Sequence, residues 1–192
     1  MGTLVRIVDL VPEAATAVQQ VAALLVEGFQ EQAPDAWPEL ASALEEVRES
    51  FGADRLSRVA VDERGAVLGW VGGIRQYHGH VWELHPLVVR PDRRGRGIGR
   101  ALVTDLEGRV RQRGGITLWL GTDDEMGQTT LSGVDLYPDV CAHIAAVRNL
   151  RGHPYEFYRK LGFAIVGVLP DANGPGKPDI YMAKRVARRT ED

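Results

Sequence analysis

At 192 residues, the chain has the length of one domain or of one domain with an elaborated loop. Hydrophobic residues make up 44% and charged residues 26%, the balance of a globular protein with one sizeable core. The net charge of −3 argues against a general binder of nucleic acid or of anionic membranes. Cys141 is the single cysteine, so no disulfide can form within the chain. Residues 1–9 lack a signal-peptide pattern, so we expect a cytoplasmic protein. The length and the lack of a clear domain boundary predict one domain over residues 1–192.

The first half of the chain predicts a strand, two helices and three strands. Alternation of apolar and polar residues indicates strands, and apolar residues at steps of three and four indicate helices. The predicted elements are a strand at 4–8, helices at 12–29 and about 37–51, and strands at 57–62, 66–77 and 80–89. Pro86 lies inside the last strand and cannot donate a ladder hydrogen bond, so we expect a bulge or a splayed edge there.

The second half predicts a helix that follows a glycine-rich turn, and then shorter elements. In order, these are a helix at 97–113, a buried strand at 116–120, a long polar loop at 121–139, helices at 142–150 and 154–161, and strands at 163–169 and 179–184. Long loops of this kind are often functional. The whole order is a mixed α/β pattern with one βαβ crossover at its centre.

The most informative segment joins the strand at 80–89 to the following helix. It reads Leu87-Val88-Val89-Arg90-Pro91-Asp92-Arg93-Arg94-Gly95-Arg96-Gly97-Ile98-Gly99-Arg100. Glycines lack a Cβ atom and let backbone N–H groups approach a phosphate closely. A helix N-terminus adds unsatisfied donors and a partial positive charge, and the arginines raise the local potential further. The segment therefore predicts a pyrophosphate site.

Other readings of a glycine-rich turn fit this sequence less well. A dinucleotide-binding turn has Gly-x-Gly-x-x-Gly after the first strand, whereas Gly95-x-Gly97-x-Gly99 follows the fourth predicted strand. A Walker loop needs Gly-Lys followed by Ser or Thr, a triplet that the sequence lacks. An RNA-binding Arg-Gly segment is normally longer and disordered. A basic helix start without a ligand remains an alternative.

Two motifs resemble those of the GNAT acetyltransferases. Val89-x-Pro91-x-x-Arg94-x-x-Gly97-x-Gly99 resembles motif A of that family, and Phe157-Tyr158-Arg159-Lys160-Leu161-Gly162-Phe163 resembles its motif B. The resemblance covers most of the chain from Val67 onward and, less distinctly, residues 4–29. It implies the GNAT fold, an α/β (α+β) architecture with a mixed central sheet of about six to seven strands, splayed at its centre, and about four to five flanking helices.

The resemblance implies an acetyl-CoA-dependent N-acetyltransferase that uses no metal. Main-chain amides from Gly95 to Arg100 would cradle the pyrophosphate of acetyl-CoA, and the backbone of Leu87 to Val89 would pair with its pantetheine arm as an added strand. The implied cofactor-binding residues are Leu87, Val88, Val89, Arg94, Gly95, Arg96, Gly97, Ile98, Gly99, Arg100 and Tyr158.

Acetyl transfer to an amine requires a neutral nucleophile and a proton donor for the departing thiolate, so a general base helps. Glu83 and His85 lie two residues apart on one predicted strand and share a face. By resemblance, Glu83 stands where histone-type members carry a glutamate base. Our hypothesis is that Glu83 accepts the amine proton, directly or through water, with His85 as alternate or relay. The alternative is that Glu83 is a solvated edge residue and His85 a polar core residue.

In the family, the tyrosine of motif B donates a proton or a hydrogen bond to the sulfur of coenzyme A, a role that falls here on Tyr158. The alternative is a tyrosine that only packs at a helix end. Motif B often has an asparagine seven residues before this tyrosine. Arg151 stands there in this chain, with Asn149 two residues earlier, so the sequence does not support a role for Asn149 on the coenzyme arm.

The acceptor amine is less well indicated. Acidic residues of the loop at 121–139, among them Asp123 and Asp124, would attract a cationic substrate or form a solvated loop. The tail at 168–185 resembles bacterial GNAT proteins labelled aminoglycoside 6′-N-acetyltransferase-like. We expect a small-molecule amine as acceptor and a homodimer as the assembly, without nucleic acid or membrane. A protein or peptide acceptor, and a non-catalytic acyl-CoA-binding module, remain alternatives.

Overall fold

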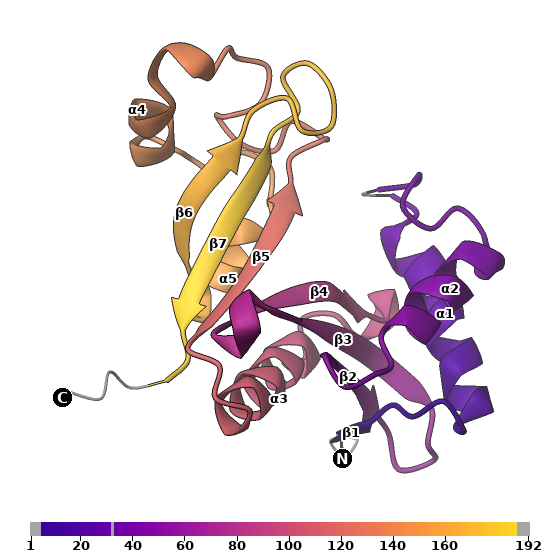
Figure 1. The fold of residues 1–192 in the computed structure, drawn as a ribbon. Helices are drawn as coiled ribbons and strands as arrows, with labels where there is room; N and C mark the ends of the chain where they lie inside the picture. Colours follow the sequence, from indigo (N-terminus) through magenta and orange to yellow (C-terminus); the bar gives the residue numbers. More distant parts are fainter. Residues whose placement is uncertain (1–4, 32, 188–192) are drawn as a thin grey trace, which may run out of the picture. The chain divides into compact units, whose positions relative to one another are not determined.

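A computed structural model describes residues 5–31 and 33–187 of the chain. These residues form two compact units, of which one comprises residues 5–118 with 186 and 187, and the other Trp119–Arg185 (Figure 1).

The first unit contains an antiparallel sheet in the strand order β1-β2-β3-β4. Its strands are β1 (Arg6–Asp9), β2 (Arg55–Val61), β3 (Val67–Gln76) and β4 (Val81–Val89). The turn between β2 and β3 is closed by Asp62, whose carboxylate accepts hydrogen bonds from the N–H groups of Arg64 and Ala66. These four strands confirm the predicted ones, with ends that differ by at most two residues among the described residues. Leu4 of the first predicted strand lies outside the described residues.

Three helices belong to this unit, α1 (Ala15–Phe29), α2 (Leu40–Glu49) and α3 (Ile98–Gln112). Alternate residues of a strand point to opposite faces of a sheet. Trp70 of β3 is fully buried in a cluster with the apolar residues of α1 and α2. Its neighbours on the other face, Gly69 and Gly73, lie against Leu102 and Leu106 of α3. The central strands are therefore covered on both faces, by α1 and α2 on one and by α3 on the other (Figure 1).

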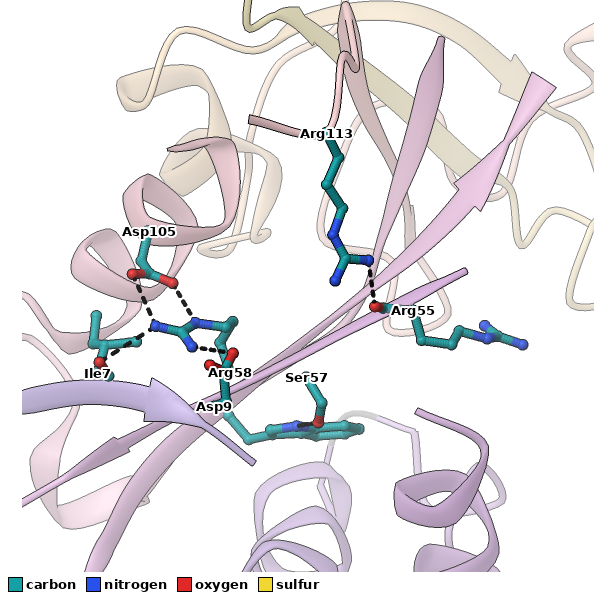
Figure 2. A network of polar contacts seen from close by, with 8 residues as sticks. Ile7, Asp9, Arg55, Ser57, Arg58, Asp105 and Arg113 are labelled. Carbon is teal, nitrogen blue, oxygen red and sulfur yellow. Dashed lines mark hydrogen bonds and ion pairs between the residues drawn. The ribbon is translucent and has the colours of Figure 1, made fainter. Parts of the chain in front are cut away.

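An arginine links β1, β2 and α3 on the α3 face. Arg58 of β2 is 1% exposed and donates from Nε to Asp105 Oδ2 at 2.6 Å and from Nη2 to Asp105 Oδ1 at 3.2 Å. It also pairs with Asp9 of β1, as Figure 2 shows. Burial alone would lower the pKa of Arg58, but the hydrogen bonds and charges of Asp105 and Asp9 raise it above its usual value. The guanidinium therefore stays charged inside the protein and holds α3 to the sheet.

The predicted irregularity at Pro86 is confirmed as a bulge in β4. Val71 pairs with Leu87 and Gly73 with Leu84, so His85 and Pro86 together oppose Gly72. A Cβ atom on Gly72 would collide with the carbonyl oxygen of His85. The bulge thus depends on a glycine in the neighbouring strand.

The second unit contains the strands β5 (Thr117–Asp123), β6 (Ala164–Leu169) and β7 (Asp179–Arg185), in the order β5-β7-β6. The first two residues of β5 belong to the first unit. Strands β6 and β7 are antiparallel, with a register shift between Ile165 and Gly167. Two short helices, α4 (Val140–Ala145) and α5 (Tyr155–Lys160), complete the unit. Single 3-10 turns occur at Tyr77–Gly79, Pro91–Arg93 and Tyr137–Asp139.

Two predictions for this region were wrong in detail. Helix α4 ends at Ala145, not at Leu150, because Arg148 and Leu150 donate backbone hydrogen bonds to the loop at 128–130 instead. The apolar run at 116–120 predicts a buried strand. In β5, however, only Leu118 and Leu120 are buried, and Ile116 just before the strand is 41% exposed.

Seven strands and five α-helices in the described residues confirm the expected mixed α/β architecture. None of the helices in this part of the chain combines the length and the apolar character that a membrane crossing requires. The splayed sheet centre and the single domain over 1–192 remain predictions.

Candidate active site

The predicted anion loop connects β4 to α3 in the first unit. After Val89, a 3-10 turn at Pro91–Arg93 leads into Gly95 with φ 74° and Gly97 with φ 84°. Residues with a side chain rarely adopt this left-handed conformation, so both turns require glycine. Nothing lies within 4 Å of the place where a Cβ atom on either glycine would stand. The loop is therefore an open turn with room above its backbone, and glycine lets it adopt this conformation without strain.

Backbone donors face outward at the start of α3. Gly97 is the N-cap residue, and its carbonyl accepts the first helical hydrogen bond from Ala101 N–H at 3.0 Å. The N–H groups of Ile98, Gly99 and Arg100 precede that bond, as at every helix N-terminus. Arg96 and Arg100 are exposed beside them. This geometry suits a phosphate, because the helix dipole and both arginines favour negative charge there.

The side chain of Arg94 is hydrogen-bonded to backbone carbonyl groups of the chain itself. Its Nη2 donates to the carbonyl oxygen of Gly28 at 2.9 Å, and its Nε to that of Val89 at 3.3 Å. Arg94 therefore joins the loop to the C-terminal end of α1. Gly28 is part of this contact, since a Cβ atom there would collide with the side chain of Val88. Gly28 was not identified from the sequence, because only the folded chain brings it beside Val88 and Arg94.

Glu83 and His85 share one face of β4, as predicted. The residues that alternate with them, Trp82, Leu84 and Pro86, are buried, whereas Glu83 is half-buried and His85 exposed. Glu83 Oε2 accepts a hydrogen bond of 2.6 Å from Nε2 of Gln76 on the neighbouring strand. This bond fixes the carboxylate and uses one of its oxygen atoms, which leaves the other to accept a proton.

His85 faces the segment that contains α2. Its Nε2 lies 3.9 Å from Oε1 of Glu46, and its ring centroid lies 6.1 Å from that of Trp37. Its side chain is 46% exposed, so the alternative of a polar core residue is wrong. Glu46 and Trp37 were missed in the sequence, because no local pattern links them to β4. Together these residues make a polar, aromatic-lined surface next to Glu83.

Tyr158 lies in the second unit, in the short helix α5. It is 9% exposed and its ring packs edge-on against Phe157 and Phe163, with centroids 5.0 Å and 5.8 Å away. Burial raises the pKa of Tyr158 above its usual range. The phenol therefore stays protonated at neutral pH and can act as a hydrogen-bond donor.

Asn149 takes part in local structure only. Its Oδ1 accepts hydrogen bonds from the N–H groups of Gly152 and His153, both at 2.8 Å, and its Nδ2 donates to the carbonyl of His153 at 2.8 Å. The side-chain oxygen and one of the two amide N–H groups are thus used within the turn that precedes α5. A role on the coenzyme arm, which the sequence did not support, would require this turn to open.

The acidic loop is also largely engaged with itself. Asp124 is fully buried and accepts hydrogen bonds from the N–H of Gln128 and from the N–H and hydroxyl of Thr129. Asp123 accepts from Nδ2 of Asn173, and Asp139 from the N–H of Ala142. These carboxylates shape the loop. Their attraction for a cationic substrate remains a prediction.

Comparison with known proteins decides the family. Residues 19–130 match the Acetyltransferase (GNAT) family. The chain belongs to this family. A search of curated proteins gives no match.

Solved structures of GNAT proteins extend the match over almost the whole chain. An aminoglycoside 6′-N-acetyltransferase complexed with coenzyme A is 44% identical, with a TM-score of 0.89 over 97% of this chain and 99% of that one. An aminoglycoside 6′-N-acetyltransferase from Enterococcus faecium is 45% identical, with a TM-score of 0.87 over the same shares. An aminoglycoside 6′-acetyltransferase type Ii is 38% identical, with a TM-score of 0.72 over 96% and 99%.

These matches confirm the expected GNAT fold, the acetyl-CoA-dependent N-acetyltransferase class and acetyl-CoA as co-substrate. A small-molecule amine as acceptor is supported as well. The roles of individual residues remain predictions. Within residues 5–31 and 33–187, no group of three His, Cys, Asp or Glu side chains gathers in a way that could hold a metal ion.

Proposed function

We propose that this GNAT enzyme transfers acetyl from acetyl-CoA to the 6′-amine of an aminoglycoside. The observation that carries the proposal is the identity of 44–45% with two aminoglycoside 6′-N-acetyltransferases over 97% of this chain. The open, positively charged loop from Gly95 to Arg100 supports binding of the pyrophosphate of acetyl-CoA.

In the proposed reaction, the acceptor amine attacks the thioester carbonyl directly within a ternary complex. Glu83 takes the proton that the amine loses, directly or through water, and His85 serves as relay or alternate base. The carbon–sulfur bond breaks, and coenzyme A leaves as its thiolate. Tyr158 donates a hydrogen bond to that sulfur. Burial raises the pKa of the Tyr158 phenol, so the phenol is a weaker acid than a thiol of ordinary pKa, about 8.5. Tyr158 therefore donates a hydrogen bond to the sulfur and keeps its proton.

The test is release of coenzyme A, followed with a thiol reagent, across paired acceptors. One member of each pair is an aminoglycoside with an amine at the 6′ position, and the other carries a hydroxyl there. We expect turnover only with the amine. Turnover of both, or of polyamines and short peptides in preference to either, would contradict the proposal. Calorimetric binding of acetyl-CoA is the control for an intact cofactor site.

The assigned residues have their own test. Glu83→Gln keeps the shape of the side chain and a hydrogen bond to Gln76, but it removes the base. We expect kcat to fall by about 100-fold with little change in the affinity for acetyl-CoA. Tyr158→Phe should likewise lower kcat more than affinity. Full activity in either variant would remove that residue from the mechanism.

We further propose that the enzyme works as a homodimer in the bacterial cytoplasm, without nucleic acid or a membrane as partner. The net charge of −3 supports the absence of nucleic acid and anionic membrane as partners, and the single cysteine fits the cytoplasm. The homodimer is proposed from the resemblance to the family alone. Light scattering at several protein concentrations tests the assembly, and a monomer at all of them would contradict it.

A further inference from the structure

The turn before α5 is built around a buried histidine. His153 is 1% exposed, and it lies directly before the N-cap residue Pro154 of the helix that carries Tyr158. Its Nδ1 accepts a hydrogen bond of 3.1 Å from the N–H of Tyr155, the first residue of α5. Its Nε2 lies 3.0 Å from the carbonyl oxygen of Asp123, at the end of β5. The ring thus connects the end of a strand to the start of a helix.

These two contacts require one form of the imidazole. Because an N–H donates to Nδ1, that nitrogen carries no proton, and Nε2 must carry the one that it donates to Asp123. The ring is therefore neutral and in a single tautomer. Burial lowers the pKa of His153, against the opposing effects of the Asp123 carbonyl and of the nearby carboxylates of Asp124 and Asp123. The ring of Tyr155 packs beside it, with centroids 5.5 Å apart.

Helix α5 is too short to define its own position. It has six residues, and isolated helices of fewer than about 12 residues are marginal in water. Its N-cap residue is a proline, which has no side-chain oxygen to accept from the first turn. His153 supplies that acceptor in place of an N-cap side chain. Its backbone is held in turn by Asn149, which accepts from its N–H and donates to its carbonyl.

The position of Tyr158 follows from this cap. The N–H groups of Phe157 and Tyr158 donate to the carbonyl oxygen of Pro154, the residue that directly follows His153. A shift of the turn at 152–154 would therefore move the first turn of α5 and the phenol with it. We propose that His153 is a positioning residue, which sets the place of the Tyr158 hydroxyl by capping α5 and joining it to β5. This inference rests on the proposed role of Tyr158 in acetyl transfer.

Two substitutions separate the two contacts. His153→Asn places its Oδ1 near the position of Nδ1 and so keeps the cap, but it does not reach Asp123. His153→Gln can donate to Asp123 from its Nε2 but offers no acceptor at the place of Nδ1. His153→Gln removes the acceptor for the N–H of Tyr155, so we expect it to displace the Tyr158 phenol and to lower kcat by about ten-fold or more. His153→Asn should keep most of the activity.

A double-mutant cycle with Tyr158→Phe shows whether His153 acts through the phenol. If it does, His153→Gln should change kcat by less than about two-fold in the Tyr158→Phe background, because the group that it positions is gone. An equal loss of kcat in both backgrounds would overturn the proposal in favour of a general effect on the fold. Full kcat of Tyr158→Phe itself would overturn the role of Tyr158, and the inference with it.

A second measurement does not depend on activity. Amide hydrogen exchange reports the opening of the first turn of α5, with amides of β2 and β3 as the internal reference. We expect the amides of residues 155–158 to exchange about five-fold faster in His153→Gln and at the wild-type rate in His153→Asn. Unchanged amide exchange in His153→Gln would overturn the capping role of His153. This result does not depend on whether an aminoglycoside is the substrate.

Discussion

The carbonyl oxygen of His85 occupies the place where a side chain at Gly72 would begin. Gly72 belongs to β3, and His85 belongs to the bulge of β4 that separates Glu83 from the segment 87–89. Glycine in β3 thus permits the bulge, and the bulge sets the spacing between the proposed base and the proposed pantetheine-binding strand. The glycine in β3 and the bulge in β4 therefore depend on each other.

Gly72→Ala should destabilise the protein, because the added methyl group collides with backbone and not with a side chain that could move. Overpacking of this kind costs about 1–3 kcal/mol of the free energy of unfolding. Urea unfolding measures the loss. Gly108→Ala is the matched control, since Gly108 lies inside α3 with nothing within 4 Å of a Cβ atom. That variant should gain about 0.5–1 kcal/mol. Equal stability of the two variants would contradict the clash.

Gly97→Ala should weaken acetyl-CoA binding by about ten-fold or more. The alanine must hold φ near 84° at the N-cap of α3, and its methyl group would occupy the open space above the backbone donors. Calorimetry with acetyl-CoA gives the dissociation constant. Gly65→Ala introduces the same kind of strain, with φ 80° and open space around it, in the turn between β2 and β3. If Gly65→Ala weakened binding as much as Gly97→Ala, the loss would reflect stability and not the loop.

The anion loop could be predicted because its signal is local. The end of a strand, a run of glycines and the start of a helix lie within 14 residues, and the positive φ of Gly95 and Gly97 explains why glycine stands at those two positions. The sharing of a strand face by Glu83 and His85 is equally local. Alternation along β4 places both side chains on one face, and the bulge, which begins only at His85, leaves this arrangement unchanged.

The rest of the site depends on residues that are distant in the sequence. Arg94 bonds to Gly28, which lies 66 positions earlier, so this contact between the loop and α1 could not be inferred from the motif. The same holds for Glu46 and Trp37 beside His85. The early end of α4 has a similar cause. Helical periodicity continues to Leu150, but a bridge between Thr129 and Asn149 competes for the backbone and prevails.

The ion pairs of Arg58 predict unequal effects for its two partners (Figure 2). Asp105 is 24% exposed and holds Arg58 through two hydrogen bonds, whereas the Asp9 side chain is 65% exposed. Asp105→Ala should cost about 3 kcal/mol, because it leaves a buried guanidinium without its bidentate partner. Asp9→Ala should cost less than about 1 kcal/mol, since solvent screens the exposed carboxylate of Asp9 and Arg58 keeps its bidentate partner Asp105. Thermal and urea unfolding check both values. Equal losses would show that burial does not set the strength of the two pairs.

The stability of the protein should depend on pH through His153. Burial lowers the pKa of His153 in the folded protein below its ordinary value of about 6.5, which the unfolded chain retains. Between these two values the unfolded chain binds more protons, so the free energy of unfolding falls as the pH falls below about 6.5. One proton contributes a slope of at most about 1.4 kcal/mol per pH unit. His153→Asn removes this group and should flatten that part of the curve. Urea midpoints between about pH 7.5 and pH 5 measure both proteins. Parallel curves would show that His153 does not titrate with folding, which would contradict the neutral ring that caps α5.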